Sequence, residues 1–155
     1  MDEALSNWKQ VNELTLDFLK RIPEEKFNKK PFSPRFKNFA WEFACILSTR
    51  DGYIKGFSLG NLDGTCFSEN RELTKKEFLK KLKETNKKIL NILRDKRMNK
   101  IIYFGERMSK KSVLSWLMQH EQFHFGKLTL YFAKAGIDFP KSLLKMWGQE
   151  SFKKK

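Results

Sequence analysis

Apolar residues recur with helical spacing in four long segments of the chain, three and four positions apart. These segments are residues 2–22, 39–60, 75–97 and 109–136. Pro23 follows the first segment and Gly136 closes the last, and each residue is typical of a helix end. Thr74 and Glu77 form a capping-box pattern, and Ser109 is a suitable N-cap. The pattern therefore predicts four long helices.

The connections between these helices are too long for a simple up-and-down bundle. Residues 23–38 hold three prolines and predict a crossover loop, and residues 61–73 predict another loop. Residues 98–108 contain a short apolar run that predicts a brief extended segment, and residues 140–147 predict one last short helix. We therefore expect an all-α fold, a four-helix bundle with long crossover connections, as a single domain over residues 1–155.

The chain carries a formal net charge of +14, from 32 Lys and Arg against 18 Asp and Glu. Such a charge attracts phosphates, acidic proteins or anionic membranes. The most basic predicted helix, residues 75–97, is dominated by lysines, with arginine only at its C-terminal end, and lacks the exposed aromatic residues that nucleic-acid surfaces prefer. We therefore favour a solvated outer face here, and we do not expect nucleic acid as a partner.

The cysteines and the apolar runs bear on the compartment. Two cysteines, Cys45 and Cys66, are too few for a disulfide framework. The first residues lack the pattern of a signal peptide, and no apolar run approaches the ~20 residues that span a bilayer. These features predict a cytoplasmic protein with free thiols and no membrane partner.

The clearest candidate chemistry is the pair His120 and His124, the only two histidines of the chain. Four residues apart on a helix, they share one face and can point at one metal ion. The alternative is two core histidines, each satisfied by a hydrogen bond. A catalytic site needs a third protein ligand, and the candidates on the second predicted helix are Cys45 and Glu42.

Residues 120–124 also match the H-E-x-x-H pattern of zinc proteases, in which Glu121 would be the general base. The rest of the chain does not support that interpretation. Position 130 is Leu130 where one protease class needs a further histidine, and Glu150 is the only glutamate downstream. We therefore treat the match as a coincidence.

The segment HEQFHFGKLTLYFAKAGIDFPKSLLKMWG resembles the C-terminal signature of the DinB/YfiT-like metalloenzymes, and WEFACILSTRDGY is similar to their second-helix element. The positions that match the signature beyond the histidines are Gly126, Leu128, Tyr131, Gly136, Pro140 and Trp147. The resemblance implies helices in up-down-down-up order, often a homodimer, and a divalent metal, typically zinc or nickel, held by three side chains.

Carried over onto this chain, the resemblance makes His120 and His124 ligands and places Cys45 where the family has another histidine. Three outcomes follow: a Cys-His-His site, a site completed by Glu42, or a lost metal. Phe125 and Lys127 also depart from the family pattern, which usually has Arg and Gln there.

The resemblance also implies a function. Some family members resemble S-transferases that use low-molecular-weight thiols, so we expect a metal-dependent transferase or hydrolase acting on a small-molecule substrate. The alternative is a non-catalytic bundle that has lost its metal and serves as a binding or dimer scaffold, and nucleic-acid binding is a third, less favoured hypothesis.

Overall fold

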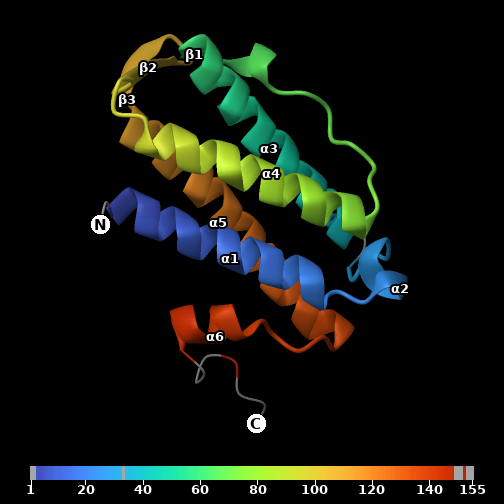
Figure 1. The fold of residues 1–155 in the computed structure, drawn as a ribbon. Coiled ribbons are helices and arrows are strands. Elements are labelled where there is room, and N and C mark those ends of the chain that lie inside the picture. The colour runs from blue at the N-terminus through green and yellow to red at the C-terminus, as the bar shows by residue number, and fades with distance from the viewer. Residues whose placement is uncertain (1–2, 33, 149–151, 153–155) are drawn as a thin grey trace.

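Four long helices form the body of the molecule, as a computed structural model shows for residues 3–32, 34–148 and 152 (Figure 1). α1 and α5 run in one direction, and α3 and α4 run in the other. α1 packs against α4 and α5, and α3 packs against the same two helices. The predicted all-α bundle in up-down-down-up order is therefore confirmed. The long helices are α1 (Glu3–Arg21), α3 (Phe39–Leu59), α4 (Lys75–Arg94) and α5 (Lys110–Ala135).

The predicted helix ends are mostly confirmed. Thr74 and Glu77 form the capping box at the start of α4, and the Ser109 side chain accepts a hydrogen bond from the backbone of α5. Gly136 ends α5 in the left-handed conformation that favours glycine. The predicted end of α4 at residue 97 is wrong. Asp95 leaves the helical conformation, and its carboxylate accepts hydrogen bonds from the backbone and side chain of Arg97 instead.

Several short elements accompany the bundle. The first crossover loop contains the unpredicted helix α2 (Glu24–Phe27), and the predicted last helix is confirmed as α6 (Lys141–Trp147). β2 (Lys100–Tyr103) and β3 (Glu106–Ser109) form a hairpin where a brief extended segment was predicted. β1 (Asn61–Leu62) pairs in parallel with β2, so the molecule contains a small three-stranded sheet that the sequence pattern did not reveal.

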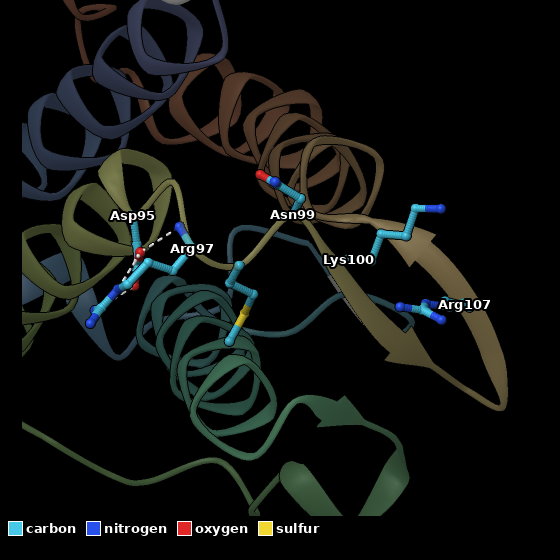
Figure 2. Close-up of a pocket in the computed structure, with 6 residues that line it drawn as sticks. Asp95, Arg97, Asn99, Lys100 and Arg107 are labelled. Carbon is cyan, nitrogen blue, oxygen red and sulfur yellow. Dashed lines mark hydrogen bonds and ion pairs between the residues drawn. The ribbon is translucent and has the colours of Figure 1, made fainter.

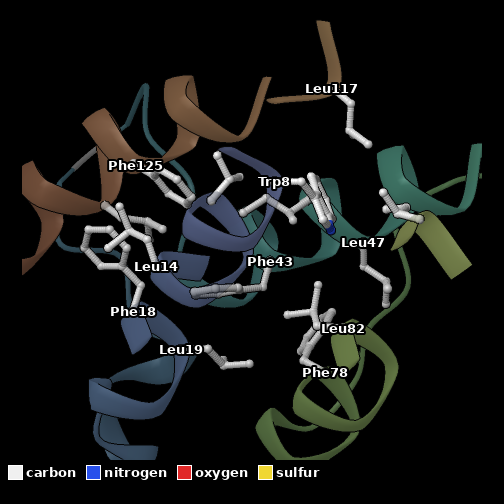
Figure 3. Packing of buried hydrophobic residues seen from close by; sticks show 14 of the residues in the cluster. Trp8, Leu14, Phe18, Leu19, Phe43, Leu47, Phe78, Leu82, Leu117 and Phe125 are labelled. Carbon is white, nitrogen blue, oxygen red and sulfur yellow. The ribbon is translucent and has the colours of Figure 1, made fainter. Parts of the chain in front are cut away.

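One core fills the space between the four helices, and it is rich in aromatic rings (Figure 3). Phe18 of α1 packs edge-on against Phe132 of α5 and stacks on Phe125, with ring centroids 5.0 and 5.7 Å away. Two glycines of α3 let the following loop approach closely: Phe67 and Leu62 occupy the space that a Cβ atom at Gly52 or Gly56 would need. No helix in the described part of the chain is long and apolar enough to cross a membrane.

Candidate metal centre

Three potential ligand atoms from α3 and α5 converge near the middle of the bundle. His120 and His124 lie one turn apart on α5, and their Nε2 atoms are 3.2 Å apart. The Cys45 Sγ atom reaches in from α3 and lies 3.6 Å from His120 Nε2. All three ligand atoms lie within 4.8 Å of one another. The structure therefore brings together the residues that the sequence comparison proposed as ligands.

Two of the three separations match those around a tetrahedral metal ion. With ordinary zinc bond lengths, two imidazole nitrogens on one tetrahedral ion lie about 3.3 Å apart, and a nitrogen and a thiolate sulfur about 3.5 Å apart. The observed distances are 3.2 Å and 3.6 Å. A Cys-His-His set also has the mixed sulfur and nitrogen chemistry that zinc accepts. The donor set thus fits a divalent ion of the zinc type.

Glu42 lies behind this cluster and holds His124 in place. Its Oε2 atom is 2.5 Å from His124 Nδ1, so this nitrogen donates a proton to the carboxylate and Nε2 faces the cluster. The other oxygen accepts a hydrogen bond from the Tyr131 hydroxyl at 2.9 Å. Lys127 forms an ion pair with Oε2 at 2.6 Å. The geometry therefore supports a positioning role for Glu42 rather than a place among the ligands.

Electrostatics around Glu42 agree with this role. Burial by itself raises the pKa of its carboxyl group, but the hydrogen bonds and charges of His124 and Lys127 outweigh burial and lower the pKa below its ordinary value. Glu42 is therefore an ionised acceptor at neutral pH, as the hydrogen bond to His124 requires.

Burial favours the neutral forms of His120 and Cys45. Burial, assisted by the neighbouring His124, lowers the pKa of His120 to about 4. Burial also raises the pKa of the Cys45 thiol. The Nδ1 atom of His120 is buried without a hydrogen-bond partner among the described residues, while its Nε2 atom lies 3.4 Å from the Thr49 hydroxyl as well as near Cys45. A neutral imidazole whose Nε2 atom faces the cluster is the form that binds metal.

Glu121 does not take part in the cluster. Its carboxylate is turned away from the ligand atoms and forms two hydrogen bonds of 2.7 Å with Arg50, and Thr15 donates a third. Both members of this ion pair are completely buried. A carboxylate held in this way is not available as the base of a protease, which agrees with the sequence argument against that interpretation.

Aromatic rings flank Lys127 beside the cluster. Its ammonium group lies 5.3 Å from the centroid of the Trp41 ring and 5.0 Å from that of Phe123. Both rings are exposed, so α3 and α5 present an aromatic rim around one cation next to Glu42.

Comparison with known proteins places the chain among its relatives. The model of the DinB family matches residues 1–142, which is most of the sequence. The chain belongs to the DinB family. Among solved structures, a DinB-like protein from Bacillus cereus ATCC 10987 shares the fold with a TM-score of 0.71 at 19% identity, over 90% of this chain and 95% of that one. No curated protein matches the chain.

The structure explains two positions, Phe125 and Lys127, at which this chain departs from the DinB signature. Phe125, where Arg is usual, points into the core and stacks on Phe18. Lys127, where Gln is usual, pairs with Glu42. Sequence reasoning missed the role of Arg50, because nothing local distinguishes a buried arginine from an exposed one. The pattern of charged and apolar residues on α3 does not reveal that Arg50 pairs with Glu121, 71 positions away.

Proposed function

We propose that this DinB-family chain is a metal-dependent enzyme that transfers a small thiol to an electrophile, with Cys45, His120 and His124 as the ligands of a zinc or nickel ion. The observation that carries the proposal is the convergence of these three ligand atoms within 4.8 Å of one another, with the two separations at His120 Nε2 close to those around one tetrahedral ion. Three protein ligands leave one position open for a substrate, as in catalytic rather than structural zinc sites.

A bound ion would lower the pKa of a thiol that occupies the open position. The residues of this chain would orient the site: Glu42 holds His124, and Trp41 and Phe123 shape the rim. In the reaction the thiol sulfur forms a bond to carbon while the leaving group departs with its bonding electrons, and the thiol proton passes to solvent.

A hydrolase is the second candidate, and the site supports it less well. Hydrolysis generally needs a base that accepts a proton from water. The two carboxylates closest in sequence to the ligands are both engaged, Glu121 by Arg50 and Glu42 by His124. A thiol that binds a metal loses its proton without such a base.

The metal is tested first. Elemental analysis of untagged protein should find about one divalent ion per chain, the minimum for a site of this kind. The His120→Ala and Cys45→Ala variants should lose it. Absence of metal after zinc or nickel supplementation, with His120→Ala as stable as the parent, would support the alternative of a scaffold that has lost its metal.

The reaction is tested separately. Metal-loaded protein should accelerate the alkylation of small thiols by a fluorogenic alkylating agent, and the acceleration should disappear after chelation. Protein that binds one ion but adds nothing to the uncatalysed rate across a panel of small thiols would count against a transferase while leaving the metal site intact. Activity on model esters instead would favour the hydrolase.

A further inference from the structure

The positive charge of the chain is concentrated in one continuous segment. Residues 75–111 contain 14 Lys and Arg against four Asp and Glu, so this segment carries +10 of the net +14. It comprises α4, the β2–β3 hairpin and the first residues of α5, which adjoin one another in the fold (Figure 1). A charge so unevenly distributed creates a local positive field that a polyanion would experience.

Along α4 the charge forms a row, which we call the lysine row. Its members are exposed and lie four, three, four and seven positions apart, so they share one face over about 27 Å of helix. They are Lys76, Lys80, Lys83, Lys87 and Arg94. Every fully exposed residue of α4 is polar or charged, because its apolar side is buried in the core. This helix has no apolar face left for insertion into a lipid surface.

A basic hollow lies just beyond the end of α4. It has a volume of about 660 Å³, and Arg97, Lys100 and Arg107 line it (Figure 2). Asp95, the only carboxylate in its lining, is already held by Arg97. Lys100 and Arg107 form no ion pair with any residue that the structure describes, so their charges are available to a ligand.

The hairpin tip adds an exposed aromatic ring. Phe104 is 55% exposed and adopts a φ of 47°, a left-handed conformation that is strained for a bulky residue. Hairpin turns of this type prefer Asn followed by Gly, and Gly105 follows here. The Phe104 ring packs edge-on against Tyr103, with centroids 5.0 Å apart, yet more than half of the residue stays exposed in a strained backbone conformation, which indicates a role in binding.

We propose that the lysine row, the basic hollow and Phe104 form a binding surface for single-stranded nucleic acid. The phosphates follow the cations of α4 into the hollow, and an unpaired base stacks on the Phe104 ring. α4 by itself has one arginine, Arg94, and no exposed aromatic residue, and the segment beyond its end adds Arg97, Arg107 and Phe104. The surface shares no residue with the metal cluster.

Fluorescence anisotropy of the full chain with a labelled 20-nucleotide oligo(dT) or oligo(U) tests the proposal. We expect binding that weakens steeply with salt, with a slope of log K against log salt near −0.7 for each phosphate contacted. The same experiment with a duplex of equal length, and with phosphatidylserine vesicles, distinguishes the ligand classes. Tighter binding to duplex would overturn the single-strand assignment, and binding to vesicles but not to oligonucleotides would overturn the proposal.

Matched variants locate the surface. The quadruple change Lys76→Gln, Lys80→Gln, Lys83→Gln and Lys87→Gln should reduce the magnitude of the salt slope by about three. The control removes the same charge from exposed lysines elsewhere, at Lys9, Lys29, Lys30 and Lys141, and should change the slope much less. Equal losses in both variants would mean diffuse attraction to a basic protein and would overturn the proposed surface.

The ring is tested by Phe104→Asn, which suits the turn and removes the stacking surface. This variant should melt a few degrees higher, because the strain is relieved, yet bind single strands roughly tenfold more weakly with an unchanged salt slope. Since a more stable protein that binds less well cannot be explained by unfolding, the pair of results isolates the ring. Unchanged affinity would overturn the stacking contact and with it the single-strand assignment.

Discussion

At the scale of single residues, Glu42 organises the candidate metal centre. Its oxygens interact with His124, Tyr131 and Lys127, so its effect on a bound ion passes through the orientation of His124. We expect Glu42→Gln to lower zinc affinity about 10- to 100-fold without abolishing binding, as is typical of groups that orient a ligand. Competition with a chromophoric chelator measures this affinity.

Two further variants complete that test. Tyr131→Phe removes one hydrogen bond to Glu42 but keeps the carboxylate, and should have a smaller effect. If Glu42→Gln abolished binding while Cys45→Ala left it intact, the third ligand would be Glu42, the alternative that the sequence left open.

His120 should make the metal-free protein sensitive to acid. Because burial and His124 lower its pKa to about 4 from the ordinary 6.5, the unfolded chain takes up this proton at a higher pH than the folded one. The His120 contribution to stability is therefore complete above pH 6.5 and is lost as the pH falls from 6.5 towards 4. Urea unfolding in EDTA at pH 7.5, 6 and 5 should show a weaker pH dependence for His120→Gln than for the parent. Parallel curves would contradict the shift.

The buried ion pair of Arg50 and Glu121 predicts an asymmetric response to mutation. Glu121→Ala leaves a buried guanidinium without its partner and should lower the free energy of unfolding by about 3–5 kcal/mol. The double change Arg50→Met and Glu121→Leu removes both charges at similar volume and should cost much less. Equilibrium urea unfolding measures both. If the double variant lost at least as much stability as Glu121→Ala, the two charges would not be coupled.

At the scale of elements, lysines satisfy the carbonyl ends of three long helices. The ammonium group of Lys75 donates to carbonyls at the end of α1, that of Lys110 to carbonyls at the end of α4, and that of Lys26 to the last carbonyl of α5. A cation at a helix C-terminus both fills unsatisfied acceptors and complements the helix dipole. Part of the lysine content therefore stabilises the bundle.

Lys110 should be the most costly of these lysines to replace, because it is only 7% exposed and serves several carbonyls. We expect Lys110→Met to lower the free energy of unfolding by about 2 kcal/mol. Lys83→Met, on the exposed face of α4, is the matched control and should change it by less than about 0.5 kcal/mol. Similar values for the two variants would argue against the cap.

The helices and strands also show which parts of the fold the sequence pattern can predict. Periodicity and capping residues predicted the long helices, because those signals are local. The small sheet was missed because β1 has two residues and pairs with a strand some forty positions later, as Asn61 opposite Ile102 shows. The end of α4 was misplaced because the side chain of Asp95 turns the chain towards Arg97, which helical periodicity does not reveal.

At the scale of the whole molecule, the long connections indicated crossovers, but the order of the helices came from the family resemblance. An apolar stripe shows which side of a helix is buried without naming the neighbour that buries it. The same limit applies to the site. The spacing of His120 and His124 is visible in the sequence, whereas the approach of Cys45 depends on α3 packing antiparallel to α5.

Because its ligands come from two helices, a bound ion should stabilise the entire bundle. Zinc that binds only the folded chain adds about 4 kcal/mol at a free concentration a thousandfold above its dissociation constant. Thermal melts should therefore shift upwards with zinc and return after EDTA. Magnesium prefers oxygen ligands and should have no effect, and the His124→Ala variant should not respond to zinc. The His124→Ala variant lacks one of the three ligands that link α3 and α5. If its melting temperature rose with zinc as much as that of the parent, the ion would be binding elsewhere.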